Sequence, residues 1–165
     1  MRVLLDTVAF LFAIEDPDRL SPKARIVMGD PANQRDLSVI SLAEIAMNNA
    51  AGKLNVSRED AMDALGRLQV SILPCAEAHV FELMTLPVYH RDPFDRMLIA
   101  QALAEDVPVM TCDKEFGKYK WFCQLDLAPF DLLIWLHLPG ESTPARPVFC
   151  CNKLLPDEGR VKVLS

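Results

Sequence analysis

The sequence predicts an α/β domain in which helices flank a central, mainly parallel sheet of four to five strands. Short apolar or β-branched runs alternate with helical patterns along the chain, which is typical of parallel strands joined by right-handed helical crossovers. With 165 residues, of which 51% are hydrophobic, the chain is long and apolar enough to bury a core. These observations favour one globular domain.

The first strand is the apolar run Arg2–Leu5, which ends at Asp6. The apolar residues that continue from Thr7 to Ile14 predict a helix directly after that strand. Ser21 followed by Pro22 is a helix start signal, because serine caps the first N–H groups and proline lacks the N–H that would stay unpaired there. We therefore expect a second helix, to about residue 28.

The second strand and the helix after it are expected to meet at Ser41. The run Leu37–Ser41 predicts the strand, and Ser41-Leu-Ala-Glu44 has the S-x-x-E form of a capping box. The helix should run to about Ala51, where Gly52 ends it. The elements expected next, in chain order, are a helix from the start signal at Ser57 to Leu68, a strand at 70–73 and a helix at 76–86.

The stretch from His90 to Asp113 has the clearest helix start of the chain. Asp92 occupies the N-cap position, Pro93 the first helical position and Asp95 the first turn. We expect a helix of about four turns, which holds no internal Gly or Pro. A short strand at 107–112, a short helix at 114–119 and a last strand at 121–125 should follow.

The net charge of −6 argues against a protein that holds nucleic acid through a broad basic surface. The five cysteines are odd in number and show no C-x-x-C spacing, so they favour reduced thiols over a disulfide framework or zinc site. The sequence contains no run of 18 or more apolar residues, which a membrane-spanning helix would need. Asp6 interrupts the first apolar run too early for a signal peptide. A cytoplasmic protein without membrane contact is expected.

Four acids follow strands or open helices, and we call them the acidic quartet. The carboxyl ends of parallel strands and the helix starts behind them meet at one sheet edge, where such folds keep their sites. The members of the quartet are Asp6, Glu44, Asp95 and Asp113.

Each acid of the quartet also has a purely structural explanation, as a cap or as a partner of a helix dipole, each contributing ~0.5–1 kcal/mol. Convergence of all four is harder to explain in that way. Two carboxylates about 4 Å apart repel by ~4 kcal/mol at an effective dielectric of 20, so a shared pocket implies a cation. Oxygen ligands alone select Mg²⁺ or Mn²⁺, and phosphodiester hydrolysis is the chemistry that such a site suits.

At these residues the chain resembles PIN domain ribonucleases, most closely the VapC-type toxins of toxin–antitoxin pairs. The matching pieces occur in family order over residues 2 to about 127. They are Val3-Leu-Leu-Asp6-Thr7, Ser41-Leu-Ala-Glu44-Ile45-Ala, His90-Arg-Asp-Pro-Phe-Asp95-Arg96 with the helix Leu98-Ile-Ala-Gln-Ala, and Thr111-Cys-Asp113 with Phe116.

The resemblance implies a PIN-like fold and a Mg²⁺- or Mn²⁺-dependent endoribonuclease that uses the acidic quartet as metal ligands and catalytic acids. It implies Thr7 and Thr111 as supporting residues, a homodimer, and a cognate antitoxin that covers the site. The RNA substrate would be transfer RNA, ribosomal RNA or messenger RNA. Arg91, Arg96 and Lys114 lie beside the acids in the sequence and would contact RNA phosphates, with solvated surface charge as the alternative. His90 is expected to be a polar loop residue rather than a catalytic base.

We expect residues 1–127 to form the PIN-like nuclease domain and residues 128–165 an atypical Pro-rich C-terminal extension. Two other functions stay open at this point. One is a non-catalytic RNA- or protein-binding module on the same scaffold. The other is a phosphatase of the haloacid dehalogenase type with Asp6 as nucleophile, although that chemistry needs an acid at position 8, where this chain has Val8.

Overall fold

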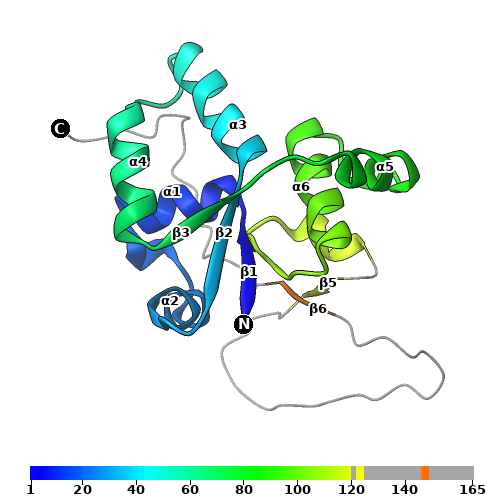
Figure 1. Ribbon diagram of the computed structural model, residues 1–165, viewed down its shortest axis with the longest axis horizontal. Helices are drawn as coiled ribbons and strands as arrows, with labels where there is room; N and C mark the ends of the chain where they lie inside the picture. Colours follow the sequence, from blue (N-terminus) through cyan, green and yellow to red (C-terminus); the bar gives the residue numbers. More distant parts are fainter. Residues whose placement is uncertain (120–121, 125–145, 149–165) are drawn as a thin grey trace.

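Four parallel strands form the central sheet of the computed structural model, in the order β3-β2-β1-β4 (Figure 1). The structure describes residues 1–119, 122–124 and 146–148. The strands are β1 (Arg2–Leu5), β2 (Gln34–Ser38), β3 (Val70–Leu73) and β4 (Val109–Met110). The expected α/β class with a parallel sheet is therefore confirmed. The strand predicted at 107–112 is shorter than expected, because only two of its residues pair with β1.

Helices cover both faces of this sheet because side chains along β1 alternate between two apolar cores. Val3 and Leu5 belong to one core and Leu4 to the other. Figure 1 shows α1, α2 and α4 on one side of the sheet and α5 and α6 on the other. The helices are α1 (Thr7–Glu15), α2 (Pro22–Gly29), α3 (Val39–Ala50), α4 (Arg58–Arg67), α5 (Glu77–Thr85) and α6 (Pro93–Ala104), with a 3₁₀ turn at Pro17–Arg19.

Three predicted helix starts are confirmed by their hydrogen bonds. The Ser21 hydroxyl accepts from the Ala24 N–H at 3.1 Å. Ser57 and Asp60 form a reciprocal capping box. Asp92 accepts from the Phe94 N–H at 2.8 Å. Each cap pairs N–H groups that the first helical turn leaves without a backbone partner.

The capping box predicted at Ser41 and Glu44 is wrong. β2 ends at Ser38, and α3 begins at Val39, with the Ser38 hydroxyl accepting from the Ile40 N–H at 2.9 Å. The Ser38 hydroxyl also donates to the side-chain oxygen of the buried Gln101 on α6. This long-range bond favours Ser38 over Ser41 as the cap. Glu44 consequently lies in the second turn of α3, clear of the capping position.

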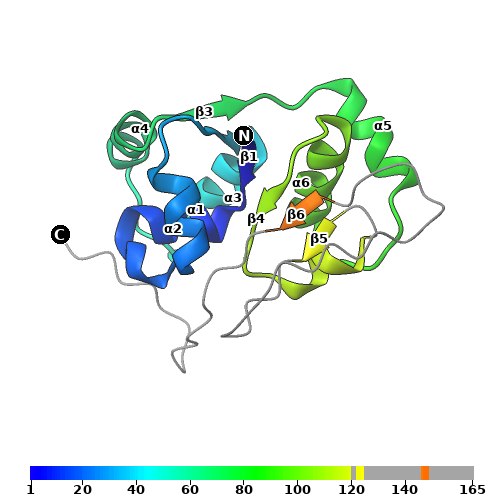
Figure 2. The ribbon, with the colours of Figure 1, turned by 90° about the horizontal axis from the view of Figure 1, so that it is seen from below.

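The predicted last strand forms as β5 (Phe122–Gln124) but does not join the central sheet. It pairs in parallel with β6 (Arg146–Val148) in a separate two-stranded sheet, visible beside β4 in Figure 2. The short helix predicted at 114–119 is the 3₁₀ helix η2 (Lys114–Lys118). Most of the proposed extension at 128–165 lies outside the described residues, and so does the boundary at 127.

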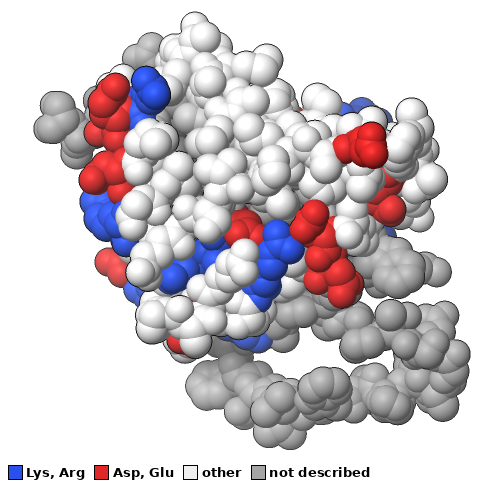
Figure 3. Space-filling model, in the orientation of Figure 1, with Lys and Arg blue, Asp and Glu red and all other residues white. Residues whose placement is uncertain are grey.

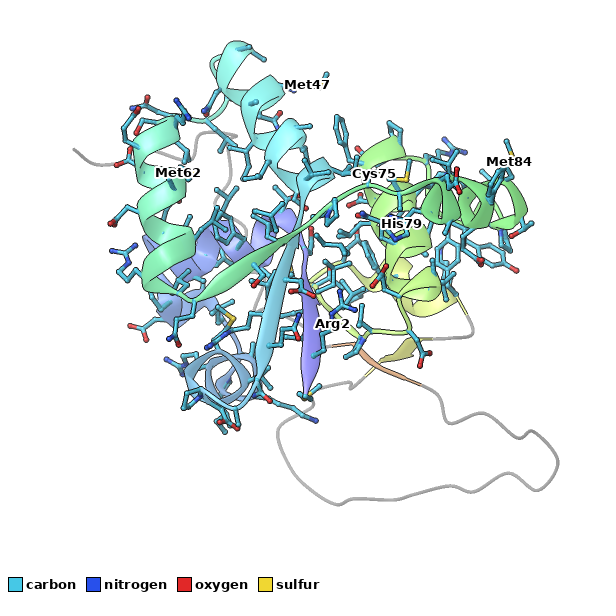
Figure 4. All side chains as sticks on the ribbon, in the orientation of Figure 1. Arg2, Met47, Met62, Cys75, His79 and Met84 are labelled. Atoms are coloured by element: carbon cyan, nitrogen blue, oxygen red, sulfur yellow. The ribbon has the colours of Figure 1, made fainter. Side chains whose placement is uncertain are left out.

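A polar network joins β1 to α6 and α5 at the end of the sheet opposite the acidic quartet. Arg2 pairs with Asp36 at 2.5 Å and with Glu105 at 2.8 Å, and Glu105 also accepts from His79 at 3.1 Å. Figure 4 shows Arg2 and His79 in this region. The hydrogen bonds from Arg2 and His79 lower the pKa of Glu105. The network therefore holds the C-terminal end of α6 against the N-terminal end of β1.

Charged side chains of both signs are interleaved on the face drawn in Figure 3, with no broad basic surface over it. Several large apolar side chains are exposed instead, among them Met47, Met62 and Met84, the last 75% exposed (Figure 4). Among the residues that the structure describes, none of the helices has the length and apolarity to cross a membrane.

Candidate metal and catalytic site

Three acids of the quartet follow β1 or β4 or lie in the first turn of α6, and the fourth comes from the second turn of α3. Asp6 directly follows β1, and Asp113 follows β4, the neighbouring strand. Asp95 lies in the first turn of α6, and Glu44 reaches the same region from α3. In Figure 1 the upper end of β1 lies between α3 and α6.

Asp6 is a buried carboxyl held by a threonine. Its side chain makes no well-formed capping hydrogen bond to α1, although weaker interactions with the N–H groups of Val8 and Thr7 lower its pKa. Instead Asp6 Oδ2 accepts from the Thr111 hydroxyl at 2.7 Å, and the residue is only 4% exposed. Burial, followed by the charge of Glu44, raises the pKa of Asp6 to about 6, although the Thr111 hydrogen bond opposes the rise.

Glu44 is oriented by the other supporting threonine. The Thr7 hydroxyl, at the start of α1, donates to Glu44 Oε2 at 2.6 Å. Thr7 is buried, so this contact fixes one end of the Glu44 carboxylate against the residue that follows Asp6. Glu44 lies in the second turn of α3 and caps no helix. Its carboxylate is instead directed at the site by the contact with Thr7.

Asp95 has the most strongly perturbed carboxyl of the site. Partial burial, followed by the charge of Asp6, raises the pKa of Asp95 to about 7, and Glu44 contributes to the rise. Asp92, three residues earlier, supplies the capping oxygen of α6, which leaves the Asp95 side chain outside that role. The electrostatic effects of Asp6 and Glu44 on Asp95 mean that these three carboxyls lie within interaction range of one another.

Asp113 has a structural role and a place in the site at once. One carboxylate oxygen accepts from the Glu115 N–H at 2.8 Å and so caps η2. The other lies 3.1 Å from His90 Nε2. The Asp113 N–H donates to the Thr111 hydroxyl at 3.0 Å. Because Thr111 also donates to Asp6, a single hydroxyl links two members of the quartet.

His90 is the residue of the site that the sequence did not indicate. It is buried, and its Nε2 lies 3.3 Å from Asp95 Oδ2 and 3.1 Å from Asp113 Oδ2. Among the described residues, ligand-type atoms of His90, Asp95 and Asp113 lie within 4.8 Å of one another. The sequence offers no signal for this contact, because it depends on η2 folding back beside the loop before α6.

The residues present fit a hard divalent cation. The donors at this edge of the sheet are carboxylate and hydroxyl oxygens, which Mg²⁺ and Mn²⁺ prefer. The raised pKa values of Asp6 and Asp95 show that their charged forms are disfavoured by burial and mutual repulsion. A bound cation would compensate both effects.

The three cations suggested as RNA contacts differ in their exposure and in what they bind. Arg96 donates to the carbonyls of Leu86 and Pro87 at 3.1 and 2.8 Å, and so holds the segment before the α6 loop. Arg91 and Lys114 are both exposed, and in the sequence they flank the segment that holds Asp92, Asp95 and Asp113.

A separate hollow of about 240 Å³ lies between α5 and Tyr119, and no residue of the quartet lines it.

Comparison with known proteins agrees with this fold. A PIN domain family model matches residues 3–122. VapBC2 from Rickettsia felis, solved bound to a DNA fragment from its promoter, aligns with a TM-score of 0.56 and 19% identity over 72% of this chain and 92% of that one. DNA-bound VapBC from Salmonella typhimurium aligns with a TM-score of 0.55 and 17% identity over 71% and 91%. No curated protein matches. Since the family model spans well over half of the sequence, this chain belongs to the PIN domain family.

Proposed function

We propose that this protein is an endoribonuclease that hydrolyses RNA phosphodiester bonds with Mg²⁺ or Mn²⁺ as cofactor. PIN domains are in general nucleases, and the acidic quartet supplies the ligands and the catalytic acids. The observation that supports this most is the electrostatics of Asp6 and Asp95. Both carboxyls have a raised pKa beside further acids, which is the arrangement that a divalent cation stabilises.

The protein's own residues have separate tasks in this proposal. Thr111 and Thr7 orient the carboxylates of Asp6 and Glu44 through short hydrogen bonds, so little reorganisation is needed when the site fills. Asp95 and Asp113 complete the oxygen ligand set. A divalent cation held by these residues would supply Lewis-acid chemistry for the hydrolysis of the phosphodiester bond.

RNA would approach over the exposed cations at the rim. Arg91 and Lys114 have the exposure needed to contact phosphates, and such contacts position a backbone without reading its sequence. Arg96 is also proposed to contact RNA phosphates. Its two hydrogen bonds to the carbonyls of Leu86 and Pro87 favour a role in holding the segment before α6. The net charge of −6 implies that binding depends on this local rim.

Metal-dependent cleavage is the direct test. We expect the purified full-length protein to cut a structured RNA in Mg²⁺ or Mn²⁺, and a chelator to abolish the cleavage until metal is added back. Cleavage that continues undiminished in chelator would contradict the proposal. RNA binding without cleavage under any metal condition would instead support the non-catalytic binding module.

The sequence and the family match both argue against the phosphatase alternative. Its chemistry needs an acid at position 8, where Val8 stands, and the family model that matches the chain is that of the PIN domain.

We further infer that the protein is a VapC-type toxin that forms a homodimer and is held inactive by a cognate antitoxin. Two of the similar structures are VapBC assemblies, and the sequence carries the VapC-like pieces in order. Exposed apolar side chains on and after α5, namely Phe81, Met84 and Val88, offer a surface for protein contacts. Transfer RNA, ribosomal RNA and messenger RNA are the substrate classes to compare.

Expression in a bacterial host tests the toxin assignment. We expect induction of the wild type to arrest growth, and co-expression of a small neighbouring gene to restore it. The Asp95→Asn variant, expressed at the same level, should not arrest growth. Normal growth with active wild-type nuclease in the cell would favour a housekeeping enzyme over a toxin.

A further inference from the structure

The protonation pattern of His90 is set by its neighbours. His90 Nδ1 accepts a hydrogen bond from the Asp92 N–H at 3.2 Å. A backbone amide is only a donor, so the ring nitrogen facing it carries no proton. The ring proton of the neutral histidine therefore lies on Nε2, the atom that faces Asp95 Oδ2 and Asp113 Oδ2.

This pattern distinguishes His90 from a metal ligand. A ligand histidine offers a lone pair, and here the available lone pair is already engaged by Asp92. The same pattern excludes His90 as a base toward the site, because Nε2 already carries the proton. What remains for Nε2 is hydrogen-bond donation to two carboxylates that would otherwise repel each other.

Tyr119 and Phe116 also hold the His90 ring in place. The His90 N–H donates to the Tyr119 hydroxyl at 2.9 Å, and that hydroxyl donates to the Pro87 carbonyl at 3.1 Å. The Phe116 ring meets the imidazole edge to face, with centroids 5.9 Å apart. Tyr119 and Phe116 are both buried, so the donor is fixed relative to η2 and α6 together.

We propose that His90 is a positioning residue that uses its Nε2–H to hold the carboxylates of Asp95 and Asp113 in the arrangement in which they bind a divalent cation. This inference rests on the proposed function. Hydrogen bonds of this kind orient ligand carboxylates, and their loss typically weakens metal binding by about 10- to 100-fold.

The test is Mn²⁺ affinity of the full-length protein, measured by titration calorimetry alongside thermal unfolding in chelator. We expect His90→Leu, which removes the donor, to weaken Mn²⁺ binding by about 10- to 100-fold. His90→Gln, whose amide nitrogen is the same number of bonds from the backbone as Nε2, should stay within a few-fold of wild type. Rescue by glutamine is not expected of a residue that only fills space.

Equal Mn²⁺ affinity of His90→Leu and wild type would overturn the inference, and so would equal weakening by leucine and glutamine. If His90→Leu does not fold, Tyr119→Phe replaces it, because this variant keeps the His90 ring and removes the hydroxyl that bonds the His90 N–H and the Pro87 carbonyl. We expect weaker Mn²⁺ binding from it, and unchanged binding would count against positioning. Absence of Mn²⁺ binding by the wild type would instead overturn the metal site itself.

Discussion

Asp95→Asn is expected to lower metal-dependent RNA cleavage by at least about 10³-fold, or ~4 kcal/mol of transition-state stabilisation. The substitution removes the charge of the carboxyl whose pKa is raised to about 7 by burial and then by the charge of Asp6. An amide of the same shape keeps the first turn of α6, so the loss should come from the cation and not from the fold. Cleavage rates at saturating Mn²⁺, with Mn²⁺ affinity measured separately, test this expectation.

Asp92→Asn is the matched control, because it makes the same chemical change three residues away. Asparagine caps helices as well as aspartate does, and the Asp92 side chain bonds the N–H groups of Phe94 and Asp95. We expect cleavage within a few-fold of wild type. Equal loss in both variants would show that activity depends on the start of α6 as a whole and would count against Asp95 as a ligand.

Asp6→Asn should stabilise the protein when metal is removed. The pKa of Asp6 is about 6 in the folded chain, above its ordinary value of 3.8, so the folded state binds the proton more tightly than the unfolded state does. Wild-type stability therefore falls as pH rises from about 4 to about 6 and stays reduced above that range. Asparagine does not titrate, and its side-chain oxygen can still accept from Thr111.

Above pH 7 the expected gain is on the order of 3 kcal/mol, or roughly 6–12 °C in the unfolding temperature of a chain of this size. At pH 4 the two proteins should unfold at similar temperatures. Thermal unfolding in chelator at both pH values measures the difference. Asp63→Asn, an exposed change on α4, controls for net charge. A stabilisation equal in size at pH 4 and pH 7 would contradict the account, as would one shared by the control.

Added Mn²⁺ should reverse the order of the two proteins. The wild type gains stability through binding, whereas Asp6→Asn, which lacks one ligand charge, gains little. If Asp6→Asn is more stable without metal and inactive with it, the charged form of the buried Asp6 carboxyl is what destabilises the metal-free protein.

Local sequence signals predicted most of the elements that carry the site. Asp92-Pro93 marks the start of α6 and Ser57 that of α4, because each cap forms within one turn. The start of α3 was misplaced because Ser38 and Ser41 are both able to cap. The choice between them depends on Gln101, 63 residues away from Ser38, and no local pattern contains that contact.

The positions of the acids followed from the general rule that parallel strands gather their carboxyl ends at one edge. The contacts among them could not be predicted in the same way. His90 joins Asp95 and Asp113 only because Tyr119 and Phe116 hold η2 against the loop. The pairing of β5 with β6 likewise depends on residues far apart in the chain.

Thr111 links two parts of the chain that pack into different apolar cores. Its hydroxyl connects Asp6, which opens the helix on one face of the sheet, with the backbone of Asp113, which precedes Phe116 in the core on the other face. The relative positions of the Asp6 and Asp113 carboxyls thus depend on how the two apolar cores pack on either side of the sheet. Mutations deep in either core, remote from the quartet, are therefore expected to displace these carboxyls while the chain is still folded.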